Sequence, residues 1–129
     1  MDINIIVNGG APDSQASYSA FRFAEQLVVS EHRLVQVFFY RAGVNQANTL
    51  QSPSGDEFNG LDAWPNLAKA NNVKLIACIS AAERRGVIGA EQQAELGVES
   101  FNLHPAFEVA GLGQMHAASL AADRTVTFK

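Results

Sequence analysis

The sequence predicts an α/β fold, a mainly parallel sheet of five strands with helices covering both of its faces. Short apolar, β-branched runs alternate with longer stretches of helical spacing, an order that is typical of parallel sheets. Hydrophobic residues make up 47% of the 129 residues and charged residues 17%, which is the balance of a folded globular chain. The length fits one domain, and neither an internal repeat nor a linker interrupts residues 1–129, so we expect a single domain.

The first strand and the first helix are predicted near the N-terminus. Residues 3–7 form a mostly apolar, β-branched run, and residues 8–10, Asn-Gly-Gly, indicate a turn. Asp13 and Ser14 are both candidate N-caps for a helix that continues to about Ser30. Apolar residues recur there at helical spacing, which predicts a buried face made of Ala20, Phe21, Ala24, Leu27 and Val28.

A second strand is predicted at residues 34–40, and a long polar connection over residues 41–58 follows it. The connection is rich in turn-forming residues, among them Gly43, Asn45 and Asn48. Connections of this length in a compact fold are usually functional or belong to an interface. We therefore expect this segment to frame a site or to pack against a neighbouring subunit.

The remaining elements complete the sheet and its cover. A helix over residues 61–70 carries Trp64 on its buried face and Pro65 in its first turn, where the missing N–H costs little. The third strand covers residues 73–78, and Ser80 is the expected N-cap of a short helix that follows. After it we predict a short helical stretch over 89–97, a strand over 107–110, a helix over 111–122 and a last strand over 125–128.

Cys78 is the residue whose position is most typical of a catalytic side chain. Sites in open parallel sheets gather at the carboxyl ends of the strands, and Cys78 ends the third strand beside a helix N-terminus. Unpaired N–H groups at that terminus favour an anion, so we expect an accessible thiol that readily forms a thiolate. Arg84 and Arg85 add positive charge one or two turns further on, and Glu83 partly opposes it. The competing interpretation is an inert core cysteine, as most free cysteines are.

Other polar candidates give weaker signals. Gly9-Gly10 follows a strand, but neither GxGxxG nor the P-loop pattern is present, so a tight turn is favoured over a phosphate site. His32, His104 and His116 show no ligand spacing, and Cys78 has no CxxC partner, so no metal site is predicted. His104 is expected in a loop, with a place beside the site as the lesser alternative.

Two further groups have a structural interpretation beside the functional one. Trp64 and the pair Phe38-Phe39 are predicted to lie in the core and not to form a binding platform. For Arg84 and Arg85 a solvated helix face and a docking role are equally supported.

Charge and composition exclude several classes of partner and location. The net charge is −4 at pH 7 and no Lys/Arg cluster occurs, so neither direct nucleic-acid binding nor electrostatic membrane attachment is expected. No apolar run approaches the ~20 residues that span a bilayer, and the first residues lack the basic segment of a signal peptide. A lone cysteine fits a reducing compartment, so we expect a cytoplasmic protein.

Several local motifs follow one another along the chain. They are Phe38-Phe39-Tyr40-Arg41-Ala42-Gly43-Val44, Ala47-Asn48, Ser52-Pro53, Asp56-Glu57-Phe58, Trp64, Cys78, Ala81-Ala82-Glu83-Arg84-Arg85-Gly86-Val87, Gly111-Leu112-Gly113 and Ala122-Asp123-Arg124. None is specific alone, but as a set they make the sequence similar to the DsrE/TusD family of sulfur-relay proteins over essentially its whole length.

One departure from the family pattern is Ser80, which stands where a small apolar residue is expected. Its hydroxyl should preserve the cap and change the polarity around the thiol.

The resemblance implies a DsrEFH-like fold, a three-layer α/β/α sandwich with a five-stranded parallel sheet. It also implies that Cys78 carries sulfane sulfur as a persulfide, a chemistry that needs neither a metal nor an organic cofactor. Tyr40 and Arg41, which belong to the first motif, and Arg84 and Arg85 are then the candidates for contacts with substrate or partner.

The two branches of the family imply different partners. The TusD branch works with TusB- and TusC-like subunits, a TusA-like sulfur donor and a TusE-like acceptor, in 2-thiolation of the wobble uridine of certain tRNAs. The DsrE branch works with DsrF- and DsrH-like subunits and a DsrC-like acceptor, in dissimilatory sulfur metabolism. Residues 102–105, Asn-Leu-His-Pro, are somewhat DsrE-like, and most of the sequence suits either branch.

Two other functions remain open at this point. One is a non-catalytic subunit that only builds a DsrEFH- or TusBCD-type complex, with Cys78 buried. The other is a flavodoxin-like domain that binds a small molecule at the Gly9-Gly10 turn. Reactivity of Cys78 towards an alkylating reagent separates the first from a sulfur carrier, and a co-purifying flavin or nucleotide would reveal the second.

Overall fold

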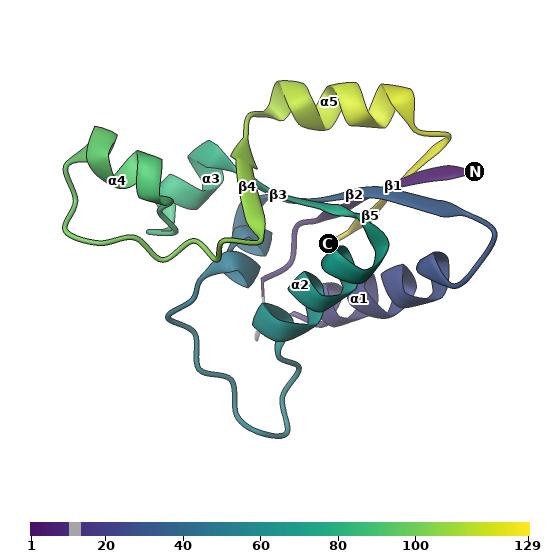
Figure 1. The fold of residues 1–129 in the computed structure, drawn as a ribbon, viewed down its shortest axis with the longest axis horizontal. Helices are drawn as coiled ribbons and strands as arrows, with labels where there is room; N and C mark the ends of the chain where they lie inside the picture. Colours follow the sequence, from purple (N-terminus) through teal and green to yellow (C-terminus); the bar gives the residue numbers. More distant parts are fainter. Residues whose placement is uncertain (11–13) are drawn as a thin grey trace.

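One five-stranded sheet forms the centre of the computed structural model, which describes residues 1–10 and 14–129. The strand order is β4-β3-β2-β1-β5, and every neighbouring pair is parallel (Figure 1). The predicted parallel sheet is thus confirmed. The strands are β1 (Asp2–Val7), β2 (Arg33–Phe39), β3 (Lys74–Cys78), β4 (Phe107–Ala110) and β5 (Arg124–Phe128).

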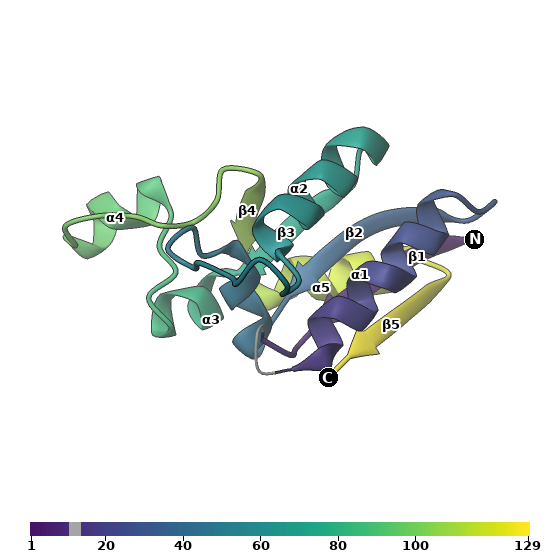
Figure 2. The same cartoon turned by 90° about the horizontal axis from the view of Figure 1, so that it is seen from below.

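Helices cover the two faces of the sheet unequally. Figures 1 and 2 show α1 and α2 on one face and α5 on the other, whereas α3 and α4 lie beyond one end of the strands. This arrangement is the predicted three-layer α/β/α sandwich. The helices are α1 (Gln15–Val28), the 3-10 helix η1 (Arg41–Ala47), α2 (Gly60–Asn71), α3 (Ile79–Arg84), α4 (Ala90–Leu96) and α5 (Leu112–Ala121).

The alternation of side chains along the strands decides which residues face which helices. Phe39 packs edge-on against Trp64 of α2, with ring centroids 5.3 Å apart, so Phe39 faces the layer of α1 and α2. Asn4 donates through Nδ2 to Ser119 Oγ of α5 at 3.2 Å, so residues in register with Asn4 face α5. Because Phe39 is paired with Ala77, the next residue, Cys78, points to the α5 side.

The larger part of the core lies under α1 and α2. Trp64 and Phe39 are fully buried on this side, and Phe38, which faces the opposite side of the sheet, is fully buried as well, as predicted. Trp64 also contacts Phe21 of α1, with ring centroids 5.1 Å apart. No residue of α5 is buried, so this helix covers its face only loosely. Burying each large apolar side chain contributes about 1.5–3 kcal/mol, which makes the α1–α2 side the main source of stability.

The caps explain where two of the helices begin. Ser14 caps α1, as predicted, because its Oγ accepts the N–H of Ala16 at 3.1 Å, whereas Asp13, the other candidate, lies outside the described residues. Helix α2 begins at Gly60, since Asn59 Oδ1 accepts the N–H of Leu61 at 3.1 Å. Pro65 therefore lies in the second turn and not in the first, so that prediction was wrong.

The polar segment 41–58, which was expected to frame a site or to pack against a neighbouring subunit, contains a short helix in its first half. Residues 41–47 form η1, and Val44 and Ala47 within it are fully buried. The helix packs against α2, β3 and α3, so this half of the segment is part of the core. Gly43 permits the packing: a Cβ there would lie 2.0 Å from the carbonyl oxygen of Val7.

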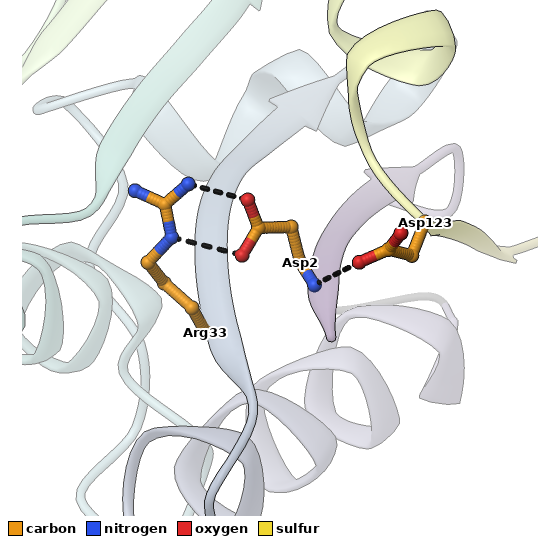
Figure 3. A network of polar contacts seen from close by, with 3 residues as sticks. All are labelled: Asp2, Arg33 and Asp123. Carbon is orange, nitrogen blue, oxygen red and sulfur yellow. Dashed lines mark hydrogen bonds and ion pairs between the residues drawn. The ribbon is translucent and has the colours of Figure 1, made fainter.

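The start of β1 carries the ion pair shown in Figure 3. Arg33 Nε donates to Asp2 Oδ1 at 3.0 Å, and its Nη2 contacts the other carboxylate oxygen. Asp123 Oδ2 accepts the backbone N–H of Asp2 at 2.7 Å, which ties the start of β5 to the start of β1. The hydrogen bond from Arg33 and its positive charge hold the pKa of the Asp2 carboxyl below its usual value.

The Asp2 carboxyl is therefore expected to titrate at lower pH in the native protein than in an Arg33→Gln variant. A carboxyl with a lowered native pKa stabilises the fold above its unfolded pKa of about 3.9, and this contribution is lost as the pH falls through the native pKa. The stability effect is expected to be small, because the pair is solvent-exposed. NMR titration of the carboxyl carbon measures the shift, and identical titration curves in both proteins would refute it.

Candidate functional site

Cys78 is the last residue of β3 and also the N-cap residue of α3. It pairs with Ala110 of β4, and its side chain is fully buried in the chain alone, with 0% exposed. The prediction of an accessible thiol was therefore wrong. The physical reason is that Cys78 is paired with Ala110 of β4 and is followed directly by α3, so the thiol is enclosed although it ends the strand as predicted.

Ser80 contacts the thiol and does not cap the helix. Helix α3 begins at Ile79, directly after the strand, so Ser80 is already the second helical residue. The distance between Ser80 Oγ and Cys78 Sγ is 3.6 Å. The predicted cap was wrong because no residue separates strand from helix. The predicted change in polarity is present, since a hydroxyl lies beside the sulfur.

Tyr40 and Arg41 lie at the carboxyl end of β2, next to the end of β3. Phe39 is paired with Ala77, so Tyr40 and Cys78 occupy the next positions on neighbouring strands. Tyr40 keeps extended backbone angles, and its half-buried side chain therefore falls on the same side of the sheet as Cys78. The structure thus brings these two predicted site residues together.

Arg41 has a strained backbone at this edge. Its φ is +52°, in the left-handed region that few residues other than glycine adopt. Its guanidinium carbon lies 5.9 Å from the centre of the Tyr40 ring, within the range of a cation–π contact. Backbone strain of this kind is concentrated at functional sites. This strain could not be predicted, because nothing in the residues around Arg41 indicates a positive φ.

Arg84 and Arg85 lie at the far end of α3 from the thiol. Arg84 is the sixth residue after Cys78, which corresponds to a helical rise of roughly 9 Å. Both side chains are exposed. Arg85 Nη1 donates to the carbonyl oxygen of Ala81 at 3.1 Å and so helps to close the last turn of α3. The two arginines thus differ: Arg85 has a structural contact within the helix.

Asn102 organises the loops at this end of the molecule, a role that sequence reasoning missed. Its Oδ1 accepts the N–H of Ile88 at 2.7 Å, and its Nδ2 donates to Gly86 O and to Asn48 Oδ1, each at 2.9 Å. The side chain thereby joins the end of η1 to the connection between α3 and α4. The only sequence signal was the motif at residues 102–105, which carried no indication of its partners.

The remaining candidates have structural contacts. His104 Nδ1 accepts the N–H of Ala106 at 3.0 Å in the turn before β4, which confirms its loop position. A Cβ on Gly10 would lie 2.8 Å from Ala42 O, so the glycine pair permits close backbone packing after β1.

Within residues 1–10 and 14–129, no three His, Cys, Asp or Glu side chains are grouped to hold a metal ion. The same residues contain no helix with the length and apolarity that crossing a membrane requires.

The fold and the site define a class: small α/β proteins with a parallel five-stranded sheet and one cysteine at its carboxyl edge. The sequence model of the DsrE/DsrF-like family matches residues 1–128. The chain therefore belongs to the DsrE/DsrF-like family, which confirms the resemblance found in the sequence.

Individual relatives support this assignment. The chain is 42% identical over 128 residues to the sulfurtransferase TusD of Serratia proteamaculans (strain 568), a match that covers 99% of both sequences. Among solved structures it is similar to the ychN protein from E. coli, with a TM-score of 0.74 at 22% identity and 99% coverage of both chains. It is also similar to MTH1491 from Methanobacterium thermoautotrophicum, a protein of unknown function, with a TM-score of 0.59 at 13% identity and 97% coverage of both. At these identities the two structures support the fold alone.

Proposed function

We propose that residues 1–129 form a single sulfur-carrier domain in which Cys78 holds sulfane sulfur as a persulfide and relays it between protein thiols. The similarity to a named sulfurtransferase, taken together with the single cysteine, carries the proposal. The chain is similar over its whole length to a protein named a sulfurtransferase, and it contains a single cysteine. Sulfur that passes by thiol chemistry through this chain must therefore pass through Cys78.

The chemistry of each step is thiol–persulfide exchange. The Cys78 thiolate attacks the outer sulfur of a donor persulfide, the donor S–S bond breaks, and the donor leaves as a thiolate. The product is Cys78–S–SH. An acceptor thiolate then attacks that outer sulfur, which regenerates the Cys78 thiolate and leaves the persulfide on the acceptor. No net oxidation or reduction occurs, and the rate depends on the thiolate fraction and on access to the sulfur.

The structure restricts access of donor and acceptor to the sulfur of Cys78. Cys78 is fully buried in the chain alone, so in-line attack requires the residues over its sulfur to move. Ser80 is the polar group beside the sulfur, and Tyr40 and Arg41 lie at the neighbouring strand end. We propose that docking of a partner opens this edge and that the partner contacts Arg41.

The test is to load the protein with sulfur from a persulfide donor and to weigh it. We expect a mass gain of one sulfur atom per chain, which a reducing agent removes. We also expect loading from a protein donor to exceed loading from a small-molecule donor at equal persulfide concentration, because a protein donor opens the edge by docking, whereas a small-molecule donor reacts only when the edge opens spontaneously. Absence of any sulfur adduct from either donor would refute the proposal.

The likeness to a TusD protein favours the tRNA-modifying branch over the DsrE branch. In this proposal the partners are TusB- and TusC-like subunits, a TusA-like donor and a TusE-like acceptor, and the sulfur serves 2-thiolation of the wobble uridine in certain tRNAs. The protein acts in the cytoplasm and contacts no RNA itself. Transfer to a TusE-like acceptor should exceed transfer to a DsrC-like one, and the reverse order would assign the chain to the DsrE branch.

Arg84→Glu combined with Arg85→Glu is expected to slow transfer to the acceptor while small-molecule loading stays near normal. Both arginines are exposed, and exposed charges act mainly on association rate and its salt dependence. Arg84→Glu alone should give most of the effect, since Arg85 also closes a helix turn. Arg85→Gln controls for that turn. Equal loss of loading and transfer would indicate damage to the fold, and no loss would leave the arginines as a solvated face.

Burial of the thiol favours one alternative, a non-catalytic subunit that only builds the complex. That function requires the chain to assemble with its partners while Cys78 neither loads sulfur nor reacts with an alkylating reagent within the assembly. The alkylation rate of the assembled complex, compared with that of the chain alone, separates the two functions. A sulfur carrier should react faster once its partners are present.

A further inference from the structure

The Ser80 hydroxyl lies between the sulfur of Cys78 and the surface of the molecule. Cys78 is fully buried, whereas Ser80, two residues later, is exposed. Ser80 Oγ and Cys78 Sγ are 3.6 Å apart, a hydrogen bond in which either atom can be the donor. The hydroxyl therefore touches the reacting atom and belongs to a residue that solvent reaches.

No other side chain within residues 1–10 and 14–129 forms a hydrogen bond with this sulfur. Titratable and charged groups do occur on the elements around it. They are Lys74 at the other end of β3, Tyr40 and Arg41 at the end of β2, Glu108 on β4, His116 on α5, and Glu83, Arg84 and Arg85 further along α3. Since none of these groups bonds to the sulfur, direct exchange of a proton with Cys78 falls to Ser80.

The proton of a buried thiol is an obstacle to sulfur exchange. The thiolate is the nucleophile, and a negative charge in an apolar environment is costly unless a donor stabilises it. A hydroxyl is both a donor and an acceptor, and it rotates to suit its partner. Ser80 Oγ can thus accept the S–H proton of the thiol, and it can donate to the sulfur once that proton has left.

The contact is local in the chain. Cys78 is the N-cap residue of α3, and Ser80 is the second residue of the same helix, so one turn holds both side chains. The two residues therefore remain neighbours when the cover of the sulfur moves to admit a donor. The hydroxyl is then available in the opened state, in which the exchange takes place.

We infer that Ser80 is a catalytic residue that relays the proton of the Cys78 thiol to solvent and then donates a hydrogen bond to the thiolate. The S–H bond breaks as its proton passes to Ser80 Oγ, and the hydroxyl proton passes from Oγ to a water molecule or a buffer base. Ser80 thus ends as a neutral hydroxyl, and no electron is transferred. The inference deepens the proposed function and rests on it for the sulfur substrate, and it concerns a residue in which this chain departs from the family pattern.

The test follows the alkylation of Cys78 by iodoacetamide against pH in the unaltered protein and in variants of Ser80. Ser80→Ala removes the hydroxyl, and Ser80→Thr and Ser80→Val form a matched pair of branched side chains that differ in the hydroxyl. The midpoint of the pH profile should rise by about one unit in Ser80→Ala and Ser80→Val, because a hydrogen bond to a charged group is lost. Ser80→Thr should keep the midpoint of the unaltered protein, and so should His116→Gln, which removes a titratable group on α5.

The rate of sulfur loading from a small-molecule persulfide donor gives a second measurement. At neutral pH a midpoint higher by about one unit lowers the thiolate fraction about tenfold, and the greater nucleophilicity of the more basic thiolate compensates for about threefold of this loss. Loading of Ser80→Ala and Ser80→Val should therefore be roughly threefold slower, while each variant still gains one sulfur atom in the end.

High iodoacetamide concentration controls for access, because the rate then becomes that of opening the edge and should be equal in all Ser80 variants. Equal midpoints in Ser80→Thr and Ser80→Val would overturn the inference. A difference that appears only at high reagent concentration would also overturn it, since the change would then lie in access to the sulfur. If no protein loads sulfur while the midpoints differ as expected, the proposed function fails and the relay stands.

Discussion

A Cys78→Ser variant is expected to lose sulfur loading completely while it keeps its fold. Serine cannot form a persulfide, and the chain offers no second cysteine that could replace it. The substituted hydroxyl would be buried, which costs free energy when it lacks a partner, but the Ser80 hydroxyl beside the sulfur can accept or donate a hydrogen bond there. Mass spectrometry after incubation with a persulfide donor measures the loading, and circular dichroism checks the fold.

Two further variants control this experiment. Cys78→Ala removes the sulfur without adding a hydroxyl, and should also fail to load. Ser80→Ala changes the polarity beside the sulfur while it keeps the thiol, and should still load one sulfur atom. A sulfur adduct on Cys78→Ser would place the chemistry on another residue, and loss of loading in Ser80→Ala alone would assign the hydroxyl a direct role.

Gly43→Ala is expected to destabilise the protein by about 3 kcal/mol or more, in the range of severe overpacking. The added Cβ would lie 2.0 Å from the carbonyl oxygen of Val7 and 2.9 Å from its carbonyl carbon. Both are backbone atoms of β1, so no side-chain rotation can relieve the clash. Helix η1 would have to move away from the sheet, and because it packs against β3 and α3, the two elements that meet at Cys78 would lose part of their packing.

The matched control is Gly55→Ala in the same connection. Nothing lies within 4 Å of a Cβ at Gly55, so this change should alter stability by no more than ~0.5 kcal/mol. Urea unfolding of the two variants and of the unaltered protein gives the comparison. We also expect faster alkylation of Cys78 in Gly43→Ala. Equal unfolding midpoints for the two variants would show that η1 accommodates the added Cβ at residue 43 without loss of stability.

The sheet could be predicted from the sequence because its signals are local. Each strand is a short apolar run bounded by turn residues, and Trp64 recurs at helical spacing with its apolar neighbours. The position of Cys78 at the end of a strand followed from the same pattern. Its burial did not, because that depends on the pairing of Cys78 with Ala110 thirty-two residues later in the chain.

Other features of the site also depend on contacts between distant segments. The bonds of Asn102 reach Asn48, and no local pattern connects these two residues. Arg41 adopts a left-handed backbone where η1 follows β2, although its residue type does not favour this conformation. The misplaced cap at Ser80 had a different cause: serine is a typical capping residue, but Ser80 lies two residues after the N-cap position, which Cys78 occupies.

The strand order has a consequence for synthesis of the protein on the ribosome. β1 lies inside the sheet, between β2 and β5, although it is the first strand to be made and β5 is the last of the five. The backbone edge of β1 that pairs with β5 stays open until residues 124–128 have left the exit tunnel, and β1 is rich in apolar residues, among them Ile3, Ile5 and Val7. Through most of translation the nascent chain therefore presents an open, hydrophobic strand edge, the kind of surface that chaperones shield from premature pairing.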